Sequence, residues 1–309
     1  MAQYTVLNNK DLETILAQYG INEVKSYNVL SGGSENTNYL VKTAVNNYVL
    51  TICEQKSIEK TIELANLLEH LSKNNFSTSK IIKTVSYKFI TVWNDKPILL
   101  KAYIEGDIIE ELPDDVLIYV GEELAKLHQI ESPKYLSKTV SYGIERFDEV
   151  KVYAPESEFY VWLKEIQKYI ESYISTDLPK ALIHSDIFYN NIIINTDDEK
   201  ATIMDFEEAC YYYRVFDIGM MIVGTCCEEN KINSKKIKSL LKGYEKEIYL
   251  LDVERTALKA FTVYGAVATA FWRHQNFNYV NIIEEKKNHY LAMKNLANSI
   301  RELSDSSFL

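Results

Sequence analysis

The sequence predicts an α+β protein with two unequal parts. Strand-like patterns are concentrated in residues 1–103, where apolar runs are separated by short turns rich in Gly, Asn and Pro. From Pro113 onward, apolar residues recur instead at helical spacing. A chain of 309 residues with 47% hydrophobic content is long and apolar enough for two lobes. We therefore expect a small antiparallel β-sheet with one main helix in residues 1–103, and a larger, mainly helical part in residues 104–309.

The first part is expected to begin with a helix over residues 11–19, because its apolar residues follow helical spacing and Gly20 is a natural stop. Ser57 is suited to cap the main helix, which runs to about Lys73 and has one apolar face. This helix should pack behind the sheet. The expected strands are residues 23–30, 37–42, 47–53, 81–85, 89–93 and 98–103.

The second part contains longer helical patterns. An apolar stripe over residues 116–127 ends at His128. The most apolar window, residues 215–227, is too short to span a bilayer and includes Asp217, which favours a buried helix. Further helices are expected at residues 156–175, 234–250, 252–272 and 281–303. Most tyrosines, including those at 211–213, are expected to pack in cores and interfaces.

Composition excludes several classes of protein. A formal net charge of -10, without a large basic cluster, argues against general nucleic-acid binding. The N-terminal residues lack a secretory signal, and no segment is apolar for long enough to cross a membrane. The 4 cysteines have neither metal-ligand spacing nor a disulfide framework. We expect a cytoplasmic protein with a small-molecule partner.

Polar residues that follow three apolar runs predict an active site. One run ends at His184 and Asp186 in a short polar loop, and a second run, residues 192–194, follows Asn191. After a turn-rich segment, a third run ends at Asp205. The second and third runs are expected to form a hairpin, which would place Asn191 and Asp205 side by side.

Phosphoryl transfer explains these residue types. Transfer from ATP requires a hydroxyl aligned with the γ-phosphate and Mg²⁺ to offset the phosphate charge. Asp186 can accept the proton or the hydrogen bond of that hydroxyl. The amide oxygen of Asn191 and the carboxylate of Asp205 are the hard oxygen ligands that Mg²⁺ prefers. ATP and Mg²⁺ are therefore the expected cofactors.

These motifs resemble the aminoglycoside phosphotransferase and choline kinase branch of the protein-kinase-like fold. The matching pattern is His-x-Asp-x-x-x-x-Asn, then apolar-Asp-Phe-Glu, then Phe-Asp-Ile-Gly at residues 216–219. Within that branch, residues 33–39 and 48–52 are similar to segments of the homoserine kinases. The resemblance implies a bilobal fold in which His184 and Asp186 belong to the catalytic loop. Asp217 would brace that loop by hydrogen bonding.

The first part is expected to bind the nucleotide. Glycines allow close backbone approach, and backbone amides with polar side chains can face phosphate oxygens. The resemblance also places the strand that leads into the adenine-binding hinge at residues 97–106. The expected nucleotide-binding residues are Gly32, Gly33, Ser34, Asn36, Asn38, Lys101 and Tyr103.

One position departs from the family. The lysine that contacts ATP normally lies on the third strand, where this chain has Thr51, as do the homoserine kinases that it resembles. Lys42 and Lys56 are both possible replacements. Its partner acid in the following helix is equally open between Glu59 and Glu63.

A homoserine site needs a cation for the carboxylate, an acid for the ammonium group and access to Asp186. Arg273 lies in the late helix that lines the acceptor pocket of relatives, and its guanidinium offers a fork for a carboxylate. Glu207 and Glu208 can meet an ammonium group, although relatives carry Tyr in place of Glu207. Homoserine is the first expectation, followed by aminoglycosides, choline, ethanolamine and amino sugars. A non-catalytic nucleotide-binding pseudokinase is the alternative class.

Overall fold

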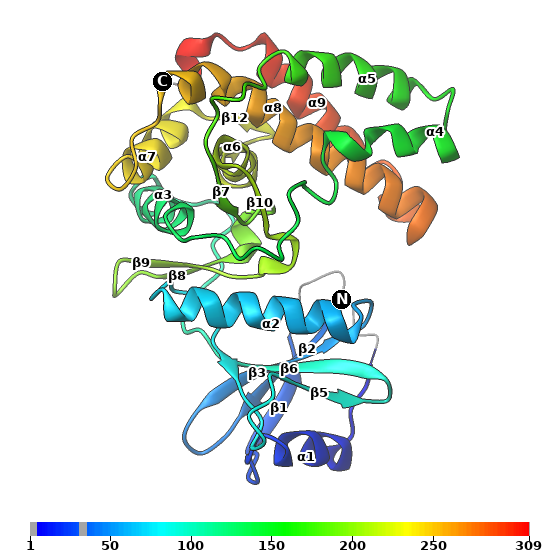
Figure 1. Ribbon diagram of the computed structural model, residues 1–309, viewed down its shortest axis with the longest axis vertical. Helices are drawn as coiled ribbons and strands as arrows, with labels where there is room; N and C mark the ends of the chain where they lie inside the picture. The colour runs from blue at the N-terminus through cyan, green and yellow to red at the C-terminus, as the bar shows by residue number, and fades with distance from the viewer. Residues whose placement is uncertain (1–4, 31–35, 309) are drawn as a thin grey trace. The chain divides into compact units, whose positions relative to one another are not determined.

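The computed structural model describes residues 5–30 and 36–308. The chain divides into two compact units, residues 1–105 and 106–309. The first unit contains an antiparallel sheet, and the second is mainly helical (Figure 1). The predicted α+β class is therefore confirmed.

The sheet of the first unit has the strand order β1-β2-β3-β6-β4, with β5 also paired to β6, and every pairing is antiparallel. Its central strands are continuous runs of apolar and β-branched residues, which suit a buried sheet. The strands are β1 (Ser26–Val29), β2 (Asn36–Lys42), β3 (Asn47–Cys53), β4 (Ile81–Ile82), β5 (Ile90–Trp93) and β6 (Lys96–Ala102).

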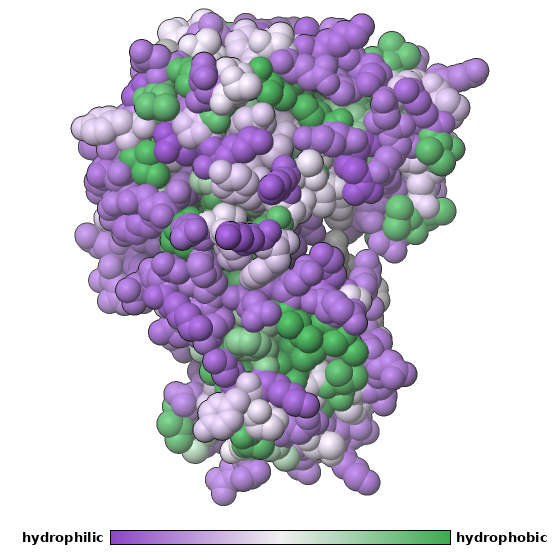
Figure 2. All heavy atoms as spheres, in the orientation of Figure 1, coloured by the Kyte–Doolittle hydropathy of each residue, from purple (hydrophilic) through white to green (hydrophobic). Residues whose placement is uncertain are grey.

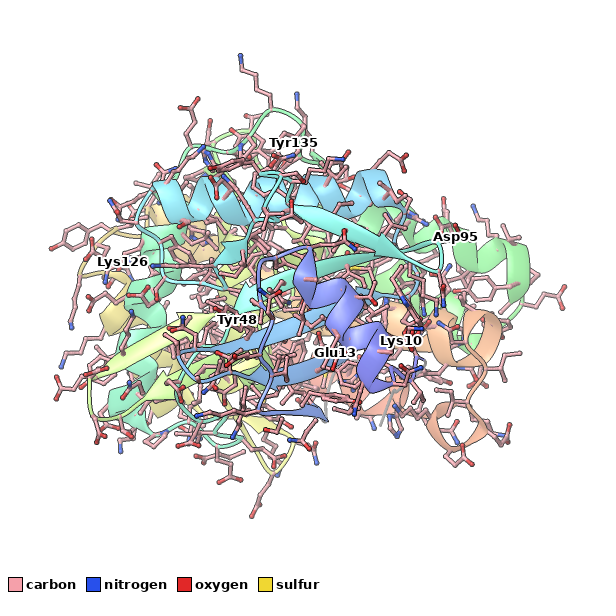
Figure 3. All side chains as sticks on the ribbon, turned by 90° about the horizontal axis from the view of Figure 1, so that it is seen from below. Lys10, Glu13, Tyr48, Asp95, Lys126 and Tyr135 are labelled. Carbon is pink, nitrogen blue, oxygen red and sulfur yellow. The ribbon has the colours of Figure 1, made fainter. Side chains whose placement is uncertain are left out.

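Two helices cover opposite faces of this sheet (Figure 1). Helix α1 (Asn9–Ala17) begins with a capping box between Asn8 and Asp11 and buries Leu12, Ile15 and Leu16. Figure 3 shows α1 lying across one face of the sheet. Helix α2 (Ile58–Lys73) is capped by the Ser57 hydroxyl, which accepts from the Lys60 amide at 3.2 Å. Side chains alternate between the two faces, so each strand contributes to both cores.

In the second unit, α6 (Arg214–Thr225) is almost entirely buried, as its continuous apolar sequence predicts. It packs closely against α8 (Asp252–Gln275). A Cβ atom on Gly219 would lie 2.5 Å from the Phe261 carbonyl oxygen, so only glycine allows this approach. The other helices are α3 (Asp114–His128), α4 (Val150–Tyr153), α5 (Glu158–Glu171), α7 (Ser234–Tyr244) and α9 (Tyr290–Glu302).

Short strand pairs carry the candidate site. Strand β8 (Ile192–Asn195) pairs with β9 (Lys200–Ile203) in the predicted hairpin, with Ile192 opposite Ile203. Strand β7 (Lys180–Ile183) pairs with β10 (Cys210–Tyr213), which the sequence did not predict. A further short pair joins β11 (Cys227–Glu228) to β12 (Lys231–Ile232).

Several predicted element ends were wrong. The expected strand over 81–85 is only Ile81–Ile82, and the segment after it turns through Tyr87 at a φ of 60°. The expected helix over 281–303 begins only at Tyr290. A π-helical turn, η4 (Asn276–Val280), extends α8 before the chain reverses. Local apolar spacing continues across these turns, so it does not reveal them.

Hydrophilic residues cover most of the visible face, and apolar residues gather in a patch on the first unit (Figure 2). Among the described residues, none of the helices combines the length and the apolar character needed to cross a bilayer.

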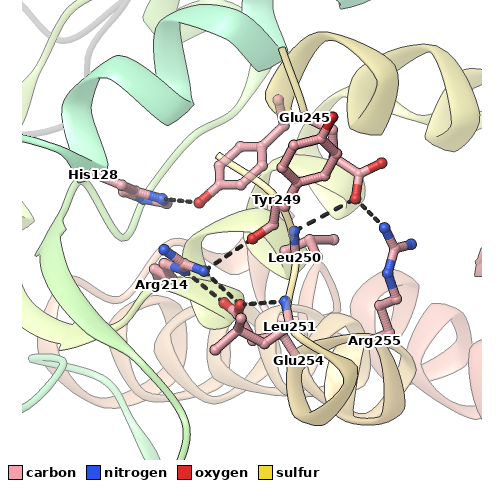
Figure 4. A network of polar contacts seen from close by, with 9 residues as sticks. His128, Arg214, Glu245, Tyr249, Leu250, Leu251, Glu254 and Arg255 are labelled. Carbon is pink, nitrogen blue, oxygen red and sulfur yellow. Dashed lines mark hydrogen bonds and ion pairs between the residues drawn. The ribbon is translucent and has the colours of Figure 1, made fainter. Parts of the chain in front are cut away.

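A buried ion pair links α6 to α8 (Figure 4). The Arg214 guanidinium donates to both Glu254 carboxylate oxygens, at 2.7 and 2.6 Å, and Glu254 is fully buried. Glu254 also accepts from the Leu251 amide at 3.0 Å, which fixes the start of α8. The bidentate geometry holds the beginning of α6, three residues before Asp217, against a second helix.

We expect Arg214→Ala to lower the free energy of unfolding by about 3–5 kcal/mol, because it leaves the Glu254 carboxylate buried without its partner. Arg255→Ala is the matched control. Arg255 pairs with Glu245, and both side chains are partly exposed, so its loss should cost about 1 kcal/mol or less. Urea unfolding of both variants tests the difference, and equal losses would contradict it.

Candidate active site

The loop that follows β7 is anchored by one buried carboxylate. Asp217 Oδ2 accepts from the His184 amide at 2.8 Å, and Oδ1 accepts from the Ser185 amide at 2.7 Å. Asp217 is fully buried and is therefore not a solvated helix cap. Charge-assisted hydrogen bonds of this kind are about twice as strong as neutral ones. They fix where the loop leaves the strand.

A second layer supports that carboxylate. His128, at the end of α3, places Nε2 3.2 Å from Asp217 Oδ2 and Nδ1 2.8 Å from the Tyr244 hydroxyl. A neutral imidazole that donates through Nε2 and accepts at Nδ1 satisfies both contacts, a tautomer assigned from the hydrogen bonds. Three helices therefore contribute to the support of this loop: α6 through Asp217, α3 through His128 and α7 through Tyr244.

The His-x-Asp-x-x-x-x-Asn motif braces itself. His184 Nδ1 accepts from the Asp186 amide at 3.2 Å, and Asn191 Nδ2 donates to the Asp186 carbonyl at 2.8 Å. Both backbone groups of Asp186 are therefore held by side chains of its own motif. This arrangement explains the fixed spacing of the three residues, and it leaves the Asp186 carboxylate for chemistry.

His184 also ties the loop to the hairpin. Its Nε2 donates to the Met204 carbonyl at 2.8 Å, while the Met204 amide donates to the Asn191 carbonyl at 2.9 Å. Because His184 is fully buried and both ring nitrogens are engaged, the structure favours a positioning role over contact with substrate. The sequence had grouped His184 with Asp186 as catalytic.

Two residues of the site have left-handed backbones. Ser185 has a φ of 70° and Asp205 a φ of 69°, conformations that are costly for residues with a Cβ atom. Ser185 is held there by Tyr142, whose hydroxyl donates to its carbonyl at 2.7 Å, and by its own hydroxyl, which donates to the Glu208 carbonyl at 2.8 Å. Such over-determined strain is typical of functional loops.

The electrostatics of Asp186 suit a base. Burial, together with the like charges of Asp205 and Glu208, raises the pKa of Asp186 to about 6. His184 and, more weakly, the positive charge of Arg273 lower the pKa of Asp186. Burial lowers the pKa of Arg273, and Asp186 opposes that shift. Each of these two side chains therefore shifts the pKa of the other.

The remaining predicted acceptor residues lie beside the loop. Ser141 donates a hydrogen bond to Glu208 Oε2, and the charge of Glu208 acts on Asp186. Glu207 is partly buried next to it on the turn η3 (Phe206–Glu208). Arg273 donates to the His289 carbonyl at 3.4 Å, which leaves most of its guanidinium donors for other partners.

The donor set at the start of the hairpin fits Mg²⁺. Asn191 uses its amide nitrogen on the loop, so its oxygen remains available as a ligand. Asp205 is exposed and forms no ion pair with any residue that the structure describes. One carboxylate and one amide oxygen, completed by water and phosphate, are typical Mg²⁺ ligands.

The predicted nucleotide residues belong to the first unit. Gly32, Gly33 and Ser34 lie outside the described residues. Asn36 begins β2, and Asn38 Oδ1 accepts from the Thr51 hydroxyl at 2.7 Å. Lys101 is near the end of β6, and the Tyr103 amide donates to the Asn47 carbonyl at 3.1 Å. Asn38 and Lys101 lie on the same sheet face as Thr51, by strand register.

Sequence reasoning missed Tyr142, Tyr244 and the role of His128. The role of His128 could have been suspected from the sequence, because His128 is a polar residue at the end of an apolar helical stripe. The two tyrosines had no such signal, since Tyr142 reaches the loop, and Tyr244 reaches His128, from distant segments.

The chain is similar to known phosphotransferases in sequence and in fold. The model of the phosphotransferase enzyme family matches residues 26–235. The homoserine kinase of Paramagnetospirillum magneticum is 26% identical over 80% of this chain and 79% of its own. A microcompartment-associated aminopropanol kinase superposes with a TM-score of 0.74 at 16% identity, covering 98% of this chain and 99% of its own. A spectinomycin phosphotransferase bound to ADP and spectinomycin gives a TM-score of 0.72 at 16% identity, covering 96% and 99%. The predicted protein-kinase-like fold is confirmed.

We expect Asp186→Asn to stabilise the metal-free protein at high pH. Because the folded state raises the pKa of Asp186 from 3.8 to about 6, its protonated side chain favours folding below pH 3.8 relative to higher pH. This advantage is lost as the pH rises through 6, where the buried carboxylate forms. The variant should gain about 1–3 kcal/mol at pH 8, and the gain should vanish near pH 4.

Urea unfolding in EDTA across this pH range provides the measurement. Asp197→Asn, in the exposed turn between β8 and β9, is the control and should show no such trend. A variant less stable than the wild type at pH 8 would contradict the raised pKa.

Proposed function

Because the chain belongs to the phosphotransferase enzyme family, whose members transfer phosphate to hydroxyl groups of small molecules, we propose that it uses ATP to phosphorylate the hydroxyl of homoserine. One observation carries this choice of acceptor. The negative charge of Glu208 raises the pKa of Asp186, and the positive charge of Arg273 lowers it, so both an anion and a cation influence this carboxyl group. Homoserine has a carboxylate and an ammonium group near its hydroxyl, so it complements both charges.

Asp186 acts on the acceptor hydroxyl. A carboxylate with a pKa of about 6 is ionised at neutral pH and remains basic enough to accept a proton in the transition state. Its backbone amide and carbonyl are held by His184 and Asn191, so the position of the residue is set before substrate binds. Positioning of this kind supplies much of the catalysis in phosphoryl transfer.

Asn191 and Asp205 would hold Mg²⁺, which offsets the negative charge of the phosphates when bound. Asp205 follows β9 with a left-handed backbone, and its side chain is exposed. Asn36, Asn38, Lys101 and Tyr103, with Gly32, Gly33 and Ser34, are proposed to bind the nucleotide.

Arg273 distinguishes homoserine from amino alcohols. The guanidinium can bind a carboxylate through two parallel hydrogen bonds. An acceptor without a carboxylate, such as ethanolamine or aminopropanol, would leave this partly buried cation unpaired. Glu208, oriented by Ser141, is proposed to bind the acceptor ammonium group. The homoserine kinases among the relatives support the same acceptor.

An ADP-release assay with homoserine, aminopropanol, ethanolamine, choline and an aminoglycoside tests the proposal. Homoserine should give the highest kcat/KM. Turnover of amino alcohols without turnover of homoserine would overturn the acceptor and leave the phosphotransferase intact. MgATP binding without turnover of any acceptor would favour the pseudokinase alternative.

We expect Arg273→Lys to raise the KM for homoserine roughly tenfold or more, because one charge-assisted hydrogen bond is lost. The KM for ATP should change little, and slow turnover of aminopropanol should be unaffected. Arg301→Lys serves as control, because Arg301 is a partly exposed arginine on α9 that pairs with Glu165. An unchanged KM for homoserine would remove Arg273 from the carboxylate site.

A further inference from the structure

The sheet of the first unit has one apolar face and one polar face. Strand register places Tyr39, Leu50 and Leu100 together on the face that packs against α1. The opposite face carries Asn38, Thr51 and Lys101. Helix α2 covers part of this second face, through Ala65 against Leu99.

Thr51 leaves the second face without the lysine that relatives of this fold carry on their third strand. Its hydroxyl donates to Asn38 Oδ1 at 2.7 Å, so the side chain is used within the sheet. A threonine cannot offset phosphate charge. If ATP binds here, another residue must supply the cation.

Three other lysines near the sheet are already engaged or poorly placed. Lys96 lies on the α1 side, where its ammonium group binds Glu54 and the Thr5 hydroxyl. Lys83 binds Glu69 of α2 at 2.8 Å. Lys42 is exposed at the outer end of β2. None of these three is both on the sheet face that carries Thr51 and partly buried.

Lys101 combines both properties. Its neighbour two residues back, Leu99, is the direct cross-strand partner of Thr51, so Lys101 is a diagonal neighbour of Thr51. Diagonal neighbours in antiparallel strands are about 7–8 Å apart, within reach of a long side chain. Lys101 is partly buried and forms no ion pair with any described residue. A partly buried ammonium group without a counterion is unfavourable, and a phosphate would relieve this.

We propose that Lys101, on β6, supplies the phosphate-binding cation that is missing from β3. The proposal rests on the proposed function, because it requires ATP as a ligand. It adds a specific role: the cation lies on β6, the strand next to β3, while Thr51 on β3 donates its hydroxyl hydrogen bond to Asn38.

Calorimetry with MgATP, MgADP and adenosine tests this role, using Lys101→Met, Lys101→Gln and Lys101→Arg. Removing the charge should weaken MgATP binding roughly tenfold or more. Adenosine binding should change by less than about twofold, because adenosine carries no phosphate to pair with Lys101. Lys101→Arg should retain most of the MgATP affinity. If the Met variant fails to fold, the polar Gln variant provides the same comparison.

Lys10→Met is the control, because Lys10 lies on α1, against the opposite face of the sheet (Figure 3). Unchanged MgATP affinity in the Lys101 variants would overturn the proposal, as would equal losses for ATP and adenosine. A selective loss of MgATP affinity in Lys42→Met instead would assign the cation to β2. Failure of the wild-type protein to bind MgATP would overturn the proposed function itself.

Discussion

Two backbone amides at the start of the loop that follows β7 donate to a single buried carboxylate, that of Asp217. The loop could not keep its position without this acceptor, because the amides of His184 and Ser185 would be buried and unpaired, at a cost of about 1–3 kcal/mol each. The acceptor in turn depends on α6 being held in place. Packing of Gly219 against α8 and the Arg214–Glu254 ion pair hold it.

Several features of this loop make the folded protein less stable. Ser185 and Asp205 have left-handed backbones, and Asp186 is surrounded by burial and like charges that raise its pKa. Each of these features destabilises the folded protein at neutral pH. The hydrogen bonds from Tyr142, His184 and Asn191 compensate locally. The result is a carboxyl group with a raised pKa on a braced backbone, which suits the proposed role of Asp186 in phosphoryl transfer.

Local sequence predicted the parts of the site that are close in the chain. Two apolar runs and a turn predicted the β8–β9 hairpin. The spacing of His184, Asp186 and Asn191 was visible in the sequence, and the structure explains it by the hydrogen bonds among these three residues. The pairing of β7 with β10 and the contact of His128 with Tyr244, 116 residues away, depend on tertiary packing that no local period records. Helix ends near Tyr290 were missed because apolar spacing continued through a turn.

The most direct test of the account is the turnover number of Asp217→Asn with homoserine and MgATP. An amide keeps the size of the side chain but offers only one oxygen acceptor to the two loop amides. We predict a fall in kcat of about 10²-fold, as expected for a small displacement of the reacting group, with the KM for ATP and the far-UV circular dichroism nearly unchanged. A folded variant with kcat within about twofold of the wild type would show that the loop does not depend on this carboxylate.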